Sequence, residues 1–177
     1  GKSKNAIETY KKISELLPDE HEYKTICYSI IGDIYHTLDQ NSTAYKYYEM
    51  ALERDPNMTS VLNNYAYYLS LERRNLKKAL QMSRKSIDIE PNNSTYLDTY
   101  GWILYLTRDL EGAKKYLKQA LVYGGKTSAV IIDHYAEVLF ALGEYDLAFM
   151  YWSDAHKLSP TMGFDKKIED KKRKIKR

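Results

Sequence analysis

Several residue types are scarce in this sequence, and each scarcity excludes a class of structure. The 177 residues include one cysteine, Cys27, which excludes an internal disulfide and a cysteine-rich zinc site. Only 8 glycines and 4 prolines occur, which disfavours a β-sandwich and a collagen-like chain. No run of 18 apolar residues is present, so we expect no membrane-spanning helix. With 44% hydrophobic and 29% charged residues, the composition is typical of a globular protein.

Positive charge is concentrated at the end of the chain. The formal net charge is +3, but residues 165–177 alone hold eight Lys or Arg and three Asp or Glu, so the remaining body carries −2. Binding of nucleic acid needs a basic face, which a nearly neutral body lacks. We therefore expect no nucleic-acid partner for the folded body, and we interpret the basic end as a solvated helix.

The sequence contains an internal repeat. Units that begin at residues 25, 60, 94 and 129 align in five columns, and the twentieth residue is Ala in all four. The twenty-seventh residue is always small, and the eighth is small in three of the four units. Small residues at fixed places allow two helices to approach closely, while large residues fill the gaps between neighbours. Each unit therefore predicts a pair of antiparallel helices, with apolar residues recurring every three or four positions.

These columns resemble the tetratricopeptide repeat, a pair of helices that stacks into a superhelix. The resemblance implies an all-α fold, a right-handed α-solenoid. It divides the chain into a truncated repeat's second helix at 1–20, four repeats at 25–58, 60–93, 94–127 and 129–162, and a basic capping helix or tail at 163–177. The helix near residues 4–17 lacks a preceding partner, so we expect the chain to be cut from a longer protein and to self-associate through this helix.

Longer phrases extend the resemblance. LNNYAYYL (62–69), YLDTYGWILY (96–105) and the stretch 131–152 are similar to the C-terminal repeats of long bacterial tetratricopeptide proteins. Members of that group often carry a secretion or lipoprotein signal. The resemblance therefore implies a scaffold in the bacterial cell envelope, periplasmic or lipid-anchored, and leaves a cytoplasmic location open.

Motifs for catalysis are missing from the sequence. No GxGxxG, GxxxxGK[ST] or HExxH occurs, and the four histidines share no spacing. Asp133, His134 and Glu137 lie close on one predicted helix, but a metal site needs more ligands from converging elements. We therefore expect no enzyme activity, no cofactor and no metal.

The resemblance implies that the first helix of each pair lines a concave groove through repeat positions 2, 5, 9 and 12. None of the sixteen residues at these positions is Lys or Arg. Carboxylates and aromatic rings dominate the candidate peptide-groove residues, which are Asp33, His36, Asn64, Tyr68, Asp98, Trp102, Tyr105, Asp133, Glu137 and Phe140. Such a groove favours a peptide that carries Arg or Lys beside an apolar anchor. The alternative is that the rings pack on neighbouring helices and the carboxylates are solvated.

The predicted function is a non-catalytic scaffold that binds a protein or peptide partner, basic and aromatic in character. Within the groove, we expect Asp98, Trp102, Tyr105 and Asp133 to meet on one wall, because they come from adjacent first helices. Two other interpretations stay open. The chain is an accessory part of a larger protein with its active domain elsewhere, or it is a structural spacer.

Overall fold

The computed structural model describes residues 2–175, which form ten α-helices, two short 3-10 helices and no strand. The expected all-α fold is confirmed. The elements are α1 (Lys2–Leu16), α2 (Glu22–Thr37), α3 (Asn41–Arg54), α4 (Thr59–Leu71), α5 (Leu76–Ile89), α6 (Ser94–Leu106), α7 (Leu110–Val122), η1 (Gly125–Thr127), α8 (Ala129–Ala141), α9 (Tyr145–Leu158), η2 (Pro160–Met162) and α10 (Phe164–Ile175).

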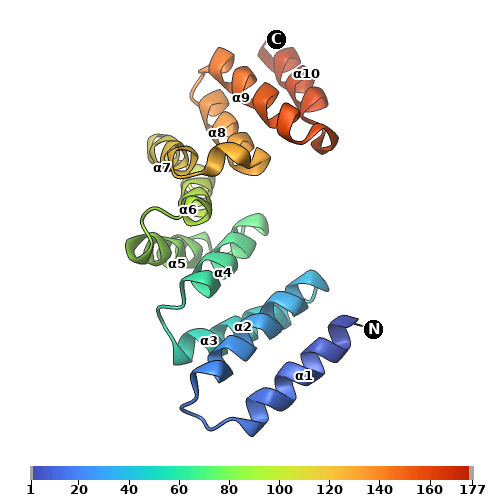
Figure 1. The fold of residues 1–177 in the computed structure, drawn as a ribbon. Helices are drawn as coiled ribbons and strands as arrows, with labels where there is room; N and C mark the ends of the chain where they lie inside the picture. The colour runs from blue at the N-terminus through green and yellow to red at the C-terminus, as the bar shows by residue number, and fades with distance from the viewer. Residues whose placement is uncertain (1, 176–177) are drawn as a thin grey trace. The chain divides into compact units, whose positions relative to one another are not determined.

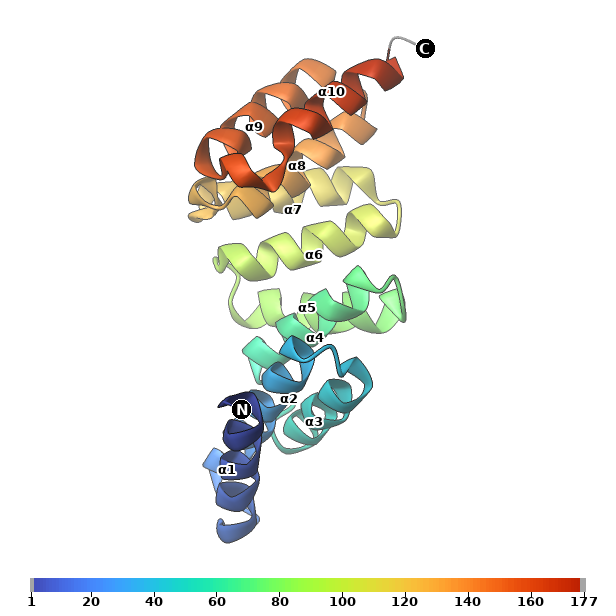
Figure 2. The same cartoon turned by 90° about the vertical axis from the view of Figure 1, so that its right-hand side faces the viewer.

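The chain divides into two compact units, and the boundary between Tyr65 and Ala66 lies inside α4. In the first unit α1 packs beside α2, and α2 pairs with α3 (Figure 1). In the second unit the tightest pairs are α6 with α7 and α8 with α9. Figure 2 shows α6, α7 and α8 following one another as successive layers of that unit.

The same turn joins the two helices of each repeat. A residue with left-handed backbone follows the first helix each time, namely Asp39, Arg73, Arg108 and Gly143, with φ between 52° and 82°. The next backbone N–H then bonds back into the helix, as Glu144 does to the Leu139 carbonyl at 2.9 Å. This is the bond pattern of a Schellman motif, which satisfies the last carbonyls of a helix. The turn therefore repeats although only one of the four residues is glycine.

Small residues in the repeat columns lie where two helices of a pair meet. The twentieth and twenty-seventh positions are completely buried in every repeat, at Ala44, Ala51, Ala79, Ser86, Ala113, Ala120, Ala148 and Ala155. At the eighth position, a methyl group added to Gly101 would lie 2.7 Å from Leu117 Cγ, and one added to Gly32 would lie 2.6 Å from the Tyr48 ring. The large residue at the twenty-fourth position therefore fills the space that the glycine leaves.

The first full repeat was expected at 25–58, and its first helix, α2, begins three residues before that range, at Glu22. The His21 side chain caps the helix by accepting a hydrogen bond from the Tyr23 N–H at 3.2 Å. In α1, Ile7 is buried, while Ile13 and Leu16 are 39% and 85% exposed. Self-association through this helix stays a prediction.

Replacing Gly101 with alanine is expected to destabilise the fold. The added methyl group also lies 3.2 Å from the Leu117 N and 3.3 Å from the Ala113 carbonyl, so backbone as well as side chain must move. Overpacking of this kind costs about 1–3 kcal/mol, against about 1 kcal/mol gained from helix propensity. Urea unfolding measures the net loss. An increase in stability for Gly101→Ala would contradict the close packing of α6 on α7.

Candidate functional site

An aromatic cluster lies on the first helices of the third and fourth repeats. The indole of Trp102 stacks on the Tyr105 ring, with centroids 4.9 Å apart, and on the His134 imidazole, with centroids 4.1 Å apart. Trp102 and Tyr105 come from α6 and are partly buried, whereas His134 comes from α8 and is buried. We call Trp102, Tyr105 and His134 the aromatic wall. Its exposed part can stack against an aromatic, apolar or cationic side chain.

Asp98 lies beneath this wall and holds the histidine. Its carboxylate is 2.9 Å from His134 Nδ1, and the two residues are only 5% and 8% exposed. Burial raises the pKa of Tyr67, and the negative charge of Asp98 raises it further. Because the Asp98 carboxylate is bound to His134 Nδ1, it orients the imidazole ring on which Trp102 stacks.

Two further predicted carboxylates, Asp133 and Glu137, are bound by lysines of α10. Lys167 forms ion pairs with both, at 2.7 Å to Glu137, and Lys171 reaches Glu137 at 2.6 Å. Asp133 also accepts a hydrogen bond from Trp152 Nε1 at 2.6 Å. Asp133 is thus bound by side chains of α9 and α10, and its expected meeting with Trp102 stays a prediction.

The same lysines lie over aromatic rings. Lys171 Nζ is 4.4 Å from the centroid of Phe140 and 5.3 Å from that of Trp152, and Lys167 Nζ is 5.4 Å from Trp152. Phe140 also contacts the Tyr145 ring at 5.0 Å. An ammonium group between carboxylates and rings is the recognition that the sequence predicted for a basic peptide. Here the chain supplies the ammonium groups itself.

The charges between α8 and α10 change the pKa of both partners. Burial raises the pKa of Glu137, but hydrogen bonds from Lys167 and Lys171 outweigh it and hold the pKa below the ordinary value of 4.5. Burial lowers the pKa of Lys167, but Asp133 and Glu137 outweigh it and hold the pKa above 10.5. Both groups therefore remain charged over the pH range in which most proteins are studied.

Charges of both signs surround Tyr105 at the edge of the wall. Burial raises the pKa of Tyr105 and Glu137 raises it further, while Arg108, Lys167 and Arg73 act in the opposite direction. The groove positions contain no Lys or Arg, but the turns and α10 bring these cations close.

The remaining predicted residues fall into two sets. In the first unit, Asp33 accepts hydrogen bonds from Tyr48 Oη at 2.6 Å and from Asn64 Nδ2 at 3.3 Å, so it ties α2 to α3 and to the start of α4. His36 lies in the last turn of α2. In the second unit, the Tyr68 ring lies 5.8 Å from that of Tyr67.

Sequence reasoning missed His134, Lys167 and Lys171 as members of this surface, and it missed Trp152 as a buried partner of Asp133. For the contacts between repeats a signal was present, because the carboxylate and its partner are about one repeat apart. The separations are 31 residues for Asp33–Asn64, 36 for Asp98–His134, and 34 for both Asp133–Lys167 and Glu137–Lys171.

Within residues 2–175, no three His, Cys, Asp or Glu side chains are placed to hold a metal ion. None of the helices described there is both long and apolar enough to cross a membrane.

Comparison with known proteins identifies the repeat. Residues 27–58, which hold most of α2 and all of α3, match the sequence profile of the tetratricopeptide repeat. This chain is similar to the tetratricopeptide repeat family, and the sequence match covers one of its four repeats. A curated relative, "Uncharacterized protein ycf37" of Pyropia yezoensis, is 33% identical over 90 residues, which are 51% of this chain and 49% of the relative. The chain thus matches about half of the length of that relative.

Solved structures share the tetratricopeptide fold at low sequence identity. MamA 41-end from Desulfovibrio magneticus RS-1 is 14% identical with a TM-score of 0.75, covering 92% of this chain and 88% of that one. YrrB, described as a TPR protein with an unusual peptide-binding site, is 15% identical with a TM-score of 0.73, covering 96% and 84%. PilF of Pseudomonas aeruginosa is 18% identical with a TM-score of 0.67, covering 90% and 79%.

Removing one lysine should loosen α10 in a pH-dependent way. Glu137 has a lowered pKa, so its pairing stabilises the fold above the ordinary Glu pKa of 4.5 and is lost as the pH falls through the folded value. Lys167 has a raised pKa, so its share is complete below 10.5 and is lost as the pH rises through the folded value. Between these limits, Lys167→Ala is expected to lower the free energy of unfolding by about 1–3 kcal/mol.

Urea unfolding and hydrogen exchange of the α10 amides measure this loss. Lys166→Ala is the matched control, because Lys166 is exposed on the same helix and makes none of these contacts. Equal effects of the two substitutions at neutral pH would refute the role of the α8–α10 ion pairs.

Proposed function

We propose that this chain is a non-catalytic protein-interaction scaffold and that the aromatic wall binds a peptide segment of a partner. The observation that carries the proposal is the stacking of Trp102 on Tyr105 and His134 while Trp102 stays partly exposed. A ring held on two sides is preorganised, so it loses little side-chain entropy when a ligand stacks on it. The likeness to YrrB supports a peptide ligand in general terms.

The proposed partner carries Lys or Arg next to an apolar side chain. Support comes from the α8–α10 contact, where carboxylates and rings of this chain already bind ammonium groups. At the wall, the cation would lie over Trp102 or Tyr105, near the charge of Glu137. Since Lys167 and Lys171 compete for that charge, binding is expected to be weak. Tyr68 is proposed as a further contact of this partner on the second unit. The first-unit residues Asp33, His36 and Asn64 are proposed as groove residues of that unit by itself.

Loss of the Trp102 ring is expected to weaken a basic peptide more than loss of a carboxylate does. Cation–π contact contributes about 0.5–2 kcal/mol, so Trp102→Ala should lower affinity for an arginine- and leucine-containing peptide about two- to thirtyfold. Asp98 is buried and bound to His134, so Asp98→Asn can act on the peptide only through the position of the His134 ring and should have the smaller effect. Fluorescence anisotropy titration at low and high salt measures the peptide affinity of both variants. High salt should remove only the part of the affinity that comes from attraction between the peptide cation and the carboxylates.

Two controls separate binding from stability. Trp102→Phe keeps an aromatic ring and should retain most of the affinity, and thermal melts of each variant report any unfolding. An acidic peptide of the same length, with glutamate in place of arginine, should bind less well. Tighter binding of the acidic peptide, or unchanged binding to a stable Trp102→Ala variant, would exclude this site for a basic partner.

The cellular setting belongs to the same proposal. We place the protein in a bacterial cell envelope on the strength of the sequence resemblance, and one similar structure, PilW, is described as a type IV pilus biogenesis factor. Sequencing the gene tests this placement: a secretion or lipoprotein signal in it would support the placement, and a catalytic domain would favour the accessory role instead.

A further inference from the structure

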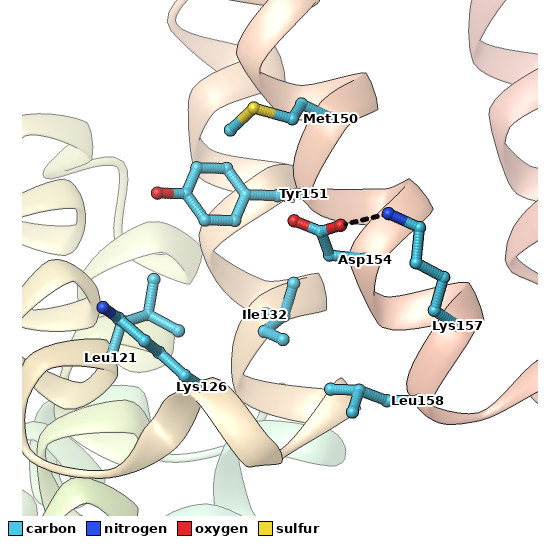
Figure 3. Close-up of a pocket in the computed structure, with 8 residues that line it drawn as sticks. All are labelled: Leu121, Lys126, Ile132, Met150, Tyr151, Asp154, Lys157 and Leu158. Atoms are coloured by element: carbon cyan, nitrogen blue, oxygen red, sulfur yellow. Dashed lines mark hydrogen bonds and ion pairs between the residues drawn. The ribbon is translucent and has the colours of Figure 1, made fainter.

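A second surface shares no residue with the aromatic wall. It is a pocket of about 410 Å³ between the end of α7, η1, the start of α8 and α9. Leu121, Ile132, Met150 and Leu158 supply its apolar lining, and Figure 3 shows their side chains around an open centre. Met150 and Leu158 are 48% and 47% exposed. Apolar side chains gathered at a hollow indicate a binding site more strongly than scattered ones do.

The rim of this pocket has an excess of positive charge. Lys157 pairs with Asp154 at 2.8 Å, the contact drawn as a dashed line in Figure 3. Lys126 is exposed and, among the described residues, forms no ion pair. A carboxylate placed beside Lys126 would therefore gain a partner without having to displace another one.

The pocket has a counterpart one repeat earlier, with a volume of about 250 Å³. Leu97 takes the place of Ile132 there, and Tyr116 takes the place of Tyr151. Because the two pockets occupy the same position in successive repeats, a single extended chain has the right form to follow both.

Cations also outnumber anions at the earlier pocket. Arg84 pairs with Asp88 at 2.9 Å, and Lys115 lies on the rim as a further cation. The two successive pockets thus share the same character, because each has apolar lining residues and one more cationic than anionic side chain.

We propose that this surface docks an extended acidic segment of a partner protein, with a leucine-like side chain in the larger pocket and carboxylates beside Lys126 and Lys115. Such a segment has the opposite charge to the basic peptide proposed for the aromatic wall. The two surfaces therefore select different partners and can be tested separately.

The probe is a short acetylated and amidated peptide with leucines flanked by glutamates. Nuclear magnetic resonance of methionine methyl groups follows the titration. The Met150 signal is expected to shift, while Met50, which is 37% exposed in the first unit, serves as an internal control. A peptide with lysine in place of glutamate should leave Met150 unshifted.

Matched variants test each half of the site. Lys126→Ala should weaken binding about two- to fivefold, whereas Lys118→Ala, an exposed lysine of α7 outside the pocket, should not. Leu158→Ser should weaken binding about fivefold, whereas Leu147→Ser, with a similar exposure of 45%, should not.

Binding that is unchanged by Trp102→Ala supports a site separate from the aromatic wall. The proposal is overturned if the acidic peptide leaves Met150 unshifted, if the lysine peptide shifts it equally, or if each variant behaves like its control. These outcomes leave the proposed role of the aromatic wall untouched.

Discussion

Carboxylates on the first helix of one repeat are held by polar groups of the next first helix, and the candidate surface depends on these contacts. Asp33 accepts from Asn64, Asp98 holds His134, and Lys167 of α10 reaches Asp133. Each pair crosses from one layer of helices to the next, so it fixes the register of the layers, and Lys167 also neutralises the charge of Asp133. A buried carboxylate without such a partner would cost several kcal/mol, which makes a mispaired register unfavourable.

These contacts decide what the wall offers to a partner. Because Asp98 orients His134, the imidazole provides a fixed platform for Trp102. Because α10 occupies Asp133 and Glu137, the end of the second unit carries a bound basic helix in place of free carboxylates. The two α8 carboxylates of a groove that the sequence suggests is acidic are therefore neutralised from within, and aromatic stacking remains as the main means of recognition at the wall.

Much of the fold could be predicted from the sequence because the repeat columns encode local packing. Ala113 and Ala148 belong to the repeat position that is alanine in all four repeats, and both are completely buried. Gly101 is small because Leu117 fills the space beside it. The side-chain contacts between successive repeats were not predicted. A repeat position shows which face of a helix a residue lies on, but it does not show which side chain of the next repeat it contacts. His134 was considered only as a metal ligand, although it stands 36 residues after Asp98, about one repeat away. Likewise, the lysines of α10 were interpreted as solvated because a charge run gives no indication of what lies beneath it.

The most direct test of this account is a double-mutant cycle on Asp98 and His134. Free energies of unfolding would be measured for the parent, for Asp98→Ala, for His134→Ala and for the double variant. If the pair ties the third repeat to the fourth, the two losses will not add, and a coupling of about 1–3 kcal/mol is expected. Strictly additive losses would mean that the two side chains act independently, and the tie between successive first helices would be contradicted.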